Sequence, residues 1–137
     1  MLAQIEDWLL ARPNSSPETG GEAGERCAAD FLAAKGLRIV SRNWRNPKDR
    51  REEIDLICTD DGILVFVEVK ARSASAKVPG YYTVNRRKKA VLLRACRAYL
   101  ASLRREPTTY RFDVVEVATR ADAAPEVLHF ENVPLFP

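Results

Sequence analysis

Residues 53–70 read EIDLICTDDGILVFVEVK, and this stretch decides the fold. It contains two apolar segments rich in β-branched residues, 53–59 and 63–70, on either side of the turn-forming Asp-Asp-Gly at 60–62. Apolar runs of this length that flank a glycine-containing turn are typical of two antiparallel strands. Because both runs are almost continuously apolar, we expect the strands to be largely buried.

Three charged side chains interrupt this predicted hairpin. Side chains alternate along a strand, so Glu68 and Lys70 share one face, and Asp55 can lie opposite them on the neighbouring strand. Two carboxylates about 4 Å apart repel each other by roughly 4 kcal/mol at an effective dielectric constant of about 20. A half-buried pair therefore needs a cation, a shared proton or a lysine. Carboxylates, a strand carbonyl and waters suit Mg²⁺ or Mn²⁺.

The same residues also have a purely structural explanation. Glu68 and Lys70 can be salt-bridge partners on a solvated face, with Asp55 an ordinary polar residue of an alternating strand. The apolar neighbours of all three residues favour a functional site, because burying a charge costs free energy of folding unless the charge is paired or binds a ligand.

The rest of the chain supplies elements that surround the hairpin. Periodicity and turn residues predict two helices and three further strands: helices over residues 22–35 and 86–103, and strands over 37–42, 110–118 and 127–131. Gly36 is expected to end the first helix, and Asn85 to cap the second. The order αβββαββ predicts an α/β fold of the α+β kind, with helices packed on a central mixed sheet.

Length and composition indicate one domain. With 137 residues, the chain is expected to form a single domain over 21–137, preceded by an N-terminal extension over 1–20 that contains a short amphipathic helix at 1–12. The 46% of hydrophobic residues are interrupted by 30% charged residues, so we expect no membrane span. Since residues 1–12 do not resemble a signal peptide, a cytoplasmic location is expected.

Cysteine and histidine chemistry is not favoured. The three cysteines at positions 27, 58 and 96 are far apart, and we expect each to be a small buried hydrophobic residue. His129 lies between Leu128 and Phe130, where a strand-surface or core histidine is more common than a catalytic one.

The net charge of +3 is modest, but basic residues gather at 42–51, 70–77 and 86–105. This clustering permits a polyanionic partner, while a simply solvated basic surface is the alternative.

Beyond the hairpin, Glu25 also calls for an explanation, because helical spacing places it on the same stripe as the apolar Ala28, Ala29 and Leu32. Together with the hairpin, these residues resemble the bacterial YraN family, which is similar to Holliday-junction resolvases of the PD-(D/E)xK nuclease superfamily. The resemblance covers residues 21 to about 136, and its motifs are Gly21-x-x-x-Glu25-x-x-Ala28-x-x-Phe31-Leu32, Gly36, Arg42-Asn43-Trp44-Arg45, Glu53-Ile54-Asp55-Leu56-Ile57, Phe66-Val67-Glu68-Val69-Lys70-x-Arg72, Val84, Lys88 and Arg111-Phe112-Asp113-Val114-Val115.

This resemblance implies a restriction-endonuclease-like core with a metal centre. Asp55, Glu68 and the Val69 carbonyl would hold the Mg²⁺ or Mn²⁺ ion, and Lys70 would position or activate the attacking water. Glu25 would support the metal through water. Nucleic acid, and DNA in particular, is the implied partner, and a homodimer is implied by analogy with resolvases.

Several residues around that centre have two possible roles. Glu53 either supports the metal ligands or is an exposed strand end, and Asp113 has a structural or supporting role. Four basic residues are candidate nucleic-acid contacts, with plain solvation as the alternative: Arg45, Arg72, Arg86 and Lys88. One departure from the family pattern is Glu52, which stands where a glycine usually precedes the Glu-Ile-Asp segment, and residues 47–51 lengthen and charge the loop before it.

Three functions are compatible with these features. The first is a magnesium-dependent endonuclease that acts on branched or otherwise structured DNA. The second is a nucleic-acid-binding protein that keeps the fold without cleavage. The third is an interaction domain that uses the apolar tail at 133–136 or the segment around Trp8.

Overall fold

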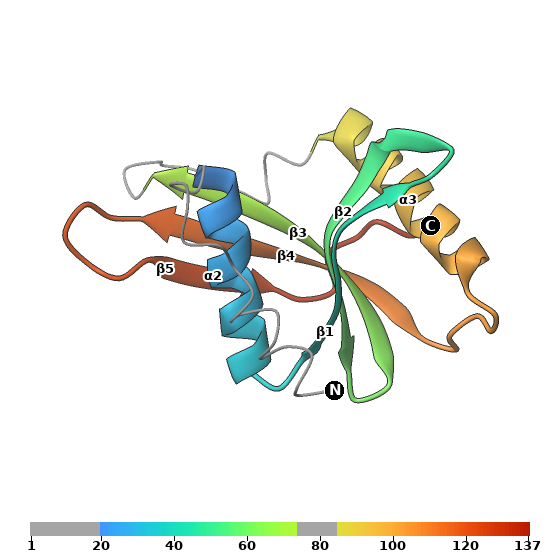
Figure 1. Cartoon of the computed structure of the whole chain (residues 1–137), viewed down its shortest axis with the longest axis horizontal. Coiled ribbons are helices and arrows are strands. Elements are labelled where there is room, and N and C mark those ends of the chain that lie inside the picture. Colours follow the sequence, from blue (N-terminus) through green and yellow to red (C-terminus); the bar gives the residue numbers. More distant parts are fainter. Residues whose placement is uncertain (1–19, 74–84) are drawn as a thin grey trace.

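The structure is a computed structural model that describes residues 20–73 and 85–137. Within these residues, five strands form one sheet in the order β1-β2-β3-β4-β5, with two helices packed on it (Figure 1). The elements are α2 (Gly20–Ala34), β1 (Arg38–Asn46), β2 (Asp49–Asp60), β3 (Ile63–Ser73), α3 (Arg86–Ser102), β4 (Tyr110–Thr119) and β5 (Glu126–Phe130). The predicted helix at 1–12 lies outside the described residues.

The strand connections confirm the predicted mixed sheet. Strands β1, β2 and β3 form an antiparallel meander, β3 and β4 are parallel, and β5 returns antiparallel to β4. A parallel pair needs a crossover connection, and α3 lies in the crossover between β3 and β4. The α+β fold and the element order αβββαββ are therefore as the sequence predicts.

Each face of the sheet carries its own hydrophobic core. The α3-side core joins α3 to alternate strand residues, and its buried members include Ile54, Ile57, Phe66, Leu92, Phe112 and Val114. The α2-side core joins α2 to the opposite residues, and its buried members include Ala28, Leu32, Leu56, Val65, Val67 and Val115. Because both faces are covered, the central strands β3 and β4 are apolar on both sides, as parallel strands in α/β proteins usually are.

The β1–β2 hairpin is longer than predicted. The predicted first strand ends at residue 42 and residues 47–51 are predicted to form a loop, whereas β1 reaches Asn46 and β2 begins at Asp49. The Asn46 side chain accepts a hydrogen bond from the Lys48 N–H at 3.0 Å, and Asp49 accepts one from the Arg51 N–H at 3.2 Å, so side chains fold the tip tightly. Apolar periodicity could not reveal these strand ends, because their residues are polar except for Trp44.

The two helices begin and end close to the predicted positions. Gly36, with a φ of 106°, follows the C-terminus of α2, and such a backbone conformation favours glycine. At the start of α3, the Asn85 side chain accepts a hydrogen bond from the Lys88 N–H at 2.9 Å, as the predicted cap should. In residues 20–73 and 85–137, neither helix has the length and apolarity that a membrane crossing requires.

Candidate active site

The site lies where the sheet forks. Strands β2 and β3 pair from Asp60↔Ile63 to Leu56↔Val67, and their register ends there. Beyond this point the two strands diverge (Figure 1). The Val69 N–H, which a neighbouring strand would otherwise satisfy, donates instead to Asp55 Oδ2 at 2.8 Å. The Asp55 carboxylate therefore takes the place of a backbone acceptor at the fork.

A bend in the β1–β2 hairpin accompanies the fork. Ile54 packs in the α3-side core and Leu56 in the α2-side core, although residues two apart on a regular strand share one face. Asn43 lies on β1 across from this bend and has a φ of 50°, a conformation that asparagine tolerates better than most residues. Its side chain forms a hydrogen bond with Glu25.

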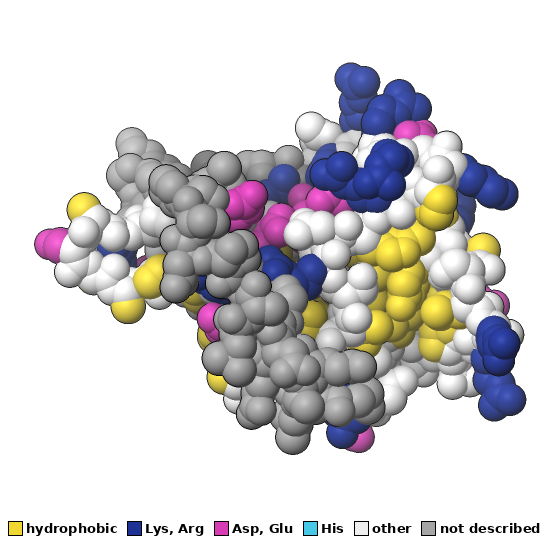
Figure 2. Space-filling view, in the orientation of Figure 1, with side chains coloured by type: hydrophobic (Ala, Val, Ile, Leu, Met, Phe, Trp, Pro, Cys, Tyr) yellow, Lys and Arg dark blue, Asp and Glu magenta, His cyan; other side chains and the backbone are white. Residues whose placement is uncertain are grey.

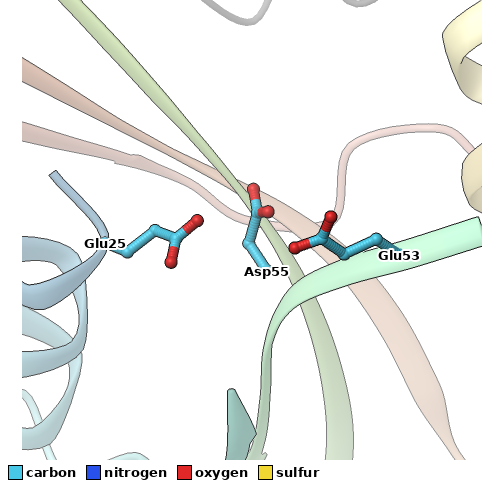
Figure 3. A group of neighbouring side chains, drawn as sticks. All are labelled: Glu25, Glu53 and Asp55. Atoms are coloured by element: carbon cyan, nitrogen blue, oxygen red, sulfur yellow. The ribbon is translucent and has the colours of Figure 1, made fainter. Parts of the chain in front are cut away.

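Three carboxylates converge on the fork from two elements. Glu25 extends from α2, and Glu53 and Asp55 extend from β2 toward it (Figure 3). One carboxylate oxygen from each of the three lies within 4.8 Å of the other two. Close helix packing supports this arrangement, since a Cβ on Gly24 would lie 3.2 Å from the Cβ of Ala71 on β3. A side chain at position 24 would therefore press the helix that carries Glu25 away from the sheet.

Glu68 approaches the fork from the other face of the sheet. By alternation it shares the α3-side face with Phe66, and it is 4% exposed. The ammonium groups of Lys70 and Lys88 each lie 3.5 Å from the same atom, Glu68 Oε1. Glu68 also forms a hydrogen bond with Asp55, so the fork connects carboxylates from both faces.

The electrostatics of the site raise the pKa of two carboxyl groups. Burial, followed by the charge of Glu68, holds the pKa of Asp55 well above its ordinary value, although the Val69 N–H acts in the opposite direction. Burial also raises the pKa of Glu25, and the charge of Glu53 adds to this effect, against a hydrogen bond from Asn43. Crowded carboxylates that resist ionisation are a common sign of a functional centre.

This donor set fits a divalent metal. All the candidate ligands are oxygens, which suit Mg²⁺ or Mn²⁺ better than softer metals. A cation would also favour the ionised carboxylates against the burial and the mutual repulsion that raise the pKa of Glu25 and Asp55. The predicted residues Asp55, Glu68, Lys70 and Glu25 thus lie together, and Glu53 joins them as a half-buried neighbour and not as an exposed strand end. Their chemical roles stay predictions.

The four candidate nucleic-acid contacts lie in different surroundings. Lys88 contacts Glu68, and Arg45 Nη2 lies 3.4 Å from Glu53 Oε2, so both border the acidic centre. Arg72 pairs with Glu116, which is 1% exposed, while Arg86 is exposed at the start of α3. A contact between Arg72 and nucleic acid would have to share its guanidinium with Glu116.

Asp113 belongs to a separate polar network. Its carboxylate accepts hydrogen bonds from Arg111 Nε at 3.0 Å and the Asn132 N–H at 2.9 Å, and its Oδ2 lies 2.7 Å from His129 Nε2. Lys35, near the end of α2, lies 2.8 Å from His129 Nδ1. Residues 25 and 35 are ten apart on or just after α2, about 15 Å along a helix, so this network lies well away from Glu25.

The cysteines and His129 are not among the ion-pairing groups of the acidic centre, although burial and then the charge of Glu68 raise the pKa of Cys96. Cys58 and Cys96 are fully buried, as predicted, whereas Cys27 is only half-buried because it lies at the edge of the α2-side core. Burial raises the pKa of Cys58 to about 12 and also raises that of Cys96, so both thiols stay protonated near neutral pH. The His129 side chain is 2% exposed, as expected of a core histidine.

The sequence did not indicate the structural roles of three polar residues near the site, although Glu52 stood out as a departure from the family pattern. Glu52 is 8% exposed and binds Asn46 Nδ2 at 3.0 Å and Arg94 Nε at 3.3 Å. Glu116 lies in the apolar run Val-Val-Glu-Val on β4, and the argument that singled out Glu68 applies to it equally. The role of Asn43 depends on its backbone conformation, which the sequence did not reveal.

The five-stranded sheet with its two helices is a mixed α+β fold, consistent with a nuclease-like core. A model of the family described as uncharacterised protein family UPF0102 matches residues 24–117. A UPF0102 protein of Symbiobacterium thermophilum is 49% identical over 102 residues, which cover 74% of this chain and 84% of the relative. One of Lawsonia intracellularis is 36% identical over 113 residues, or 82% and 83% of the two chains. The chain belongs to the UPF0102 family, which confirms the resemblance drawn from the motifs.

Proposed function

We propose that this protein is a magnesium- or manganese-dependent endonuclease that acts on structured, branched DNA. The observation that carries the proposal is the fork, where carboxylates from α2, β2 and β3 meet beside two lysines. Asp55, Glu68 and the Val69 carbonyl would hold the metal, and Glu25 and Glu53 would support it. A bound Mg²⁺ or Mn²⁺ ion supplies Lewis-acid polarisation of the phosphoryl group and lowers the pKa of water.

The protein's own residues then orient the reaction. The Val69 N–H fixes one oxygen of Asp55, which restricts the carboxylate to a single direction. During hydrolysis, a water oxygen bonds to phosphorus while the bond to the leaving oxygen breaks, and negative charge grows on the phosphoryl oxygens. Lys70, which is paired with Glu68 and still 27% exposed, is placed to donate hydrogen bonds to that charge.

A nucleic-acid-binding protein without cleavage is the second candidate. Lys70 and Lys88 both contact Glu68, and Arg45 contacts Glu53, so much of the acidic charge is already balanced by bases of the chain itself. This balance would permit a stable fold without a metal. The interaction-domain alternative has less support, because the tail residue Phe136 packs on Tyr110 with ring centroids 4.8 Å apart, within the chain's own core. Trp8 lies outside the described residues.

The decisive experiment is a calorimetric Mn²⁺ titration of the wild type, Asp55→Asn and Glu68→Gln. Each protein is then incubated with Mg²⁺ and four-way-junction, flapped, duplex or single-stranded DNA. We expect metal binding by the wild type, its loss in both variants, and product only from the wild type. Lys70→Met should bind metal and yield no product. Failure of the wild type to bind metal in the presence of DNA would exclude the proposed enzyme and favour the second candidate.

The same incubations test the proposed assembly. A homodimer would present two acidic centres to the two related strands of a symmetric junction. Sedimentation of the free protein and of its junction complex is expected to give two chains per junction. One chain per junction, with product still formed, would reject the homodimer but not the proposed nuclease activity.

A further inference from the structure

A polar groove lies between the tip of the β1–β2 hairpin and the first half of α3, with a volume of about 500 Å³. Its charged lining comprises four basic and two acidic side chains: Arg51, Arg87, Lys88, Arg94, Asp49 and Glu52. Figure 2 shows Lys and Arg side chains gathered over this region, beside the acidic side chains at the centre of the molecule. Cavities of about 300–1,000 Å³ commonly hold small ligands, so the groove is large enough for more than one phosphate group.

The groove is basic because its two acids are already engaged. Asp49 Oδ2 accepts a hydrogen bond from Arg51 Nη2 at 2.9 Å, and Glu52 Oε2 accepts one from Arg94 Nε at 3.3 Å. These pairs leave Arg87, which is exposed, without an acidic partner in the groove lining, while Lys88, which is 43% exposed along its side chain, pairs with Glu68 outside that lining. An anion that enters the groove therefore meets a net positive lining.

The start of α3 strengthens this preference. Its first four residues, 86–89, are Arg-Arg-Lys-Lys, and its first turn contains no acidic residue. The N-terminus of a helix carries partial positive charge, so basic residues there reduce helix stability and acidic ones increase it. The 17-residue helix α3 nevertheless begins with four basic residues. An anion bound at this end of the helix would explain why they are there.

Lys88 belongs both to the groove lining and to the acidic centre. Its backbone lies in the capped first turn of α3, while its Nζ lies 3.5 Å from Glu68 Oε1. The same residue lines the groove. The groove and the fork therefore share a basic residue, and a polyanion in the groove would lie next to the acidic centre.

We propose that this groove binds the phosphodiester backbone of a nucleic-acid strand, next to the phosphate held at the acidic centre. The inference rests on the proposed function and adds a surface that holds the strand beside the site. A strand is favoured over a free phosphate, because the groove exceeds the size of one phosphate group and shares Lys88 with the acidic centre. Arg87 and Arg94 would contact phosphates in addition to the four basic residues predicted from the sequence, and Glu52 would position Arg94.

The test measures binding of a labelled oligonucleotide of about 12 nucleotides by fluorescence anisotropy, with the full chain in EDTA and about 0.15 M salt. Arg87→Glu is expected to weaken binding at least about tenfold and to reduce the slope of log affinity against log salt by about one. Arg97→Glu is the matched control, because Arg97 is equally exposed and lies ten residues, or about 15 Å, further along α3. It should change the affinity less than about twofold at that salt concentration, where charges act over about 8 Å.

Each outcome decides the proposal. Equal losses in Arg87→Glu and Arg97→Glu would reject the groove in favour of general attraction to a basic surface. Binding of a mononucleotide as tightly as the oligonucleotide, with the same sensitivity to Arg87→Glu, would assign the groove to free nucleotides and overturn the strand proposal. Because Glu52→Gln releases Arg94 but also removes a negative charge from the lining, it should change oligonucleotide binding less than Arg87→Glu does, and the double variant Glu52→Gln/Arg94→Gln should bind no more weakly than Arg94→Gln alone.

A parallel Mn²⁺ titration separates this proposal from the nuclease proposal. Arg87→Glu should bind Mn²⁺ like the wild type, which also shows that the variant is folded. If the wild type binds no metal but Arg87→Glu still loses the oligonucleotide selectively, the groove stands and the nuclease fails. If metal binding and cleavage are present but Arg87→Glu binds the oligonucleotide normally, the nuclease stands and the groove proposal is overturned.

Discussion

At the scale of single residues, Asp55 illustrates a conflict between stability and a proposed metal site. Its pKa is raised by burial and by Glu68, so the ionised form destabilises the metal-free fold as the pH rises above the ordinary carboxyl range. Asp55→Asn keeps an oxygen for the Val69 N–H but cannot ionise. In EDTA near neutral pH, we expect this variant to exceed the wild type in free energy of unfolding by about 1 kcal/mol or more. Urea unfolding of both proteins measures the difference, and a less stable variant would contradict the expectation.

Asp113 shows the opposite behaviour. Burial by itself would raise its pKa, but hydrogen bonds from His129, Arg111 and the Asn132 N–H together lower it below the ordinary value. Because the folded-state pKa lies below that of the unfolded chain, the carboxylate stabilises the fold above the ordinary carboxyl range, and this stability is lost as the pH falls through the folded-state pKa. Removing one partner of such a buried pair costs about 3 kcal/mol.

Asp113→Asn should therefore reduce the free energy of unfolding by about 3 kcal/mol at neutral pH. The difference from the wild type should shrink as the pH falls from about 7 to about 3. Denaturant unfolding at several pH values provides the measurement, and Asp122→Asn serves as control because Asp122 is exposed. A difference that does not depend on pH would mean that the lost stability reflects packing and not ionisation.

At the scale of elements, the sequence predicts those helices and strands that have a clear apolar periodicity and are bounded by turn residues. The apolar, β-branched runs at 53–59 and 63–70 and the Asp-Asp-Gly turn are sufficient to predict the central hairpin, and the apolar stripe that includes Glu25 places that carboxylate toward the sheet. The fork was not predictable, because it depends on where β2 leaves β3 and on the Val69 N–H finding Asp55. The proximity of Glu53 to Glu25 was not predictable either, because it depends on the bend of β2 in the folded structure.

The basic start of α3 leads to a prediction about that helix alone. In Arg87→Glu, an unfavourable charge near the positive end of the helix dipole becomes a favourable one. Without nucleic acid, we expect the free energy of unfolding to rise by about 1 kcal/mol at low salt and by less at high salt. Thermal unfolding at two salt concentrations measures this, with Arg97→Glu, near the middle of α3, expected to gain less. A loss of stability in Arg87→Glu would show that the arginine has a structural role, which the exposed side chain does not suggest.

At the scale of the whole molecule, the fork is the place where the two hydrophobic cores meet. Glu25 belongs to the helix of the α2-side core, Glu68 lies on the α3 side, and Asp55 stands between them on β2. A metal held jointly by these carboxylates would connect α2, β2 and β3, and ligand binding to the folded state alone raises its stability. The proposed site therefore predicts a global effect: Mn²⁺ should stabilise both cores in one cooperative transition.

Mn²⁺ at about 100 times its dissociation constant adds about 2.7 kcal/mol to the free energy of unfolding, and should raise the Tm of the wild type by several degrees. Glu25→Gln removes one of the candidate carboxylates and should reduce this shift, while Glu68→Gln should abolish it. Glu131→Gln is the control, because Glu131 is exposed and pairs with Lys35 away from the fork. If tryptophan fluorescence, to which Trp44 on the α3-side core contributes, and far-ultraviolet circular dichroism shift by different amounts, the metal does not stabilise both cores together. An unchanged wild-type Tm at millimolar Mn²⁺ would mean that basic residues of the chain itself, Lys70, Lys88 and Arg45, balance the acidic charge, as the non-catalytic alternative requires.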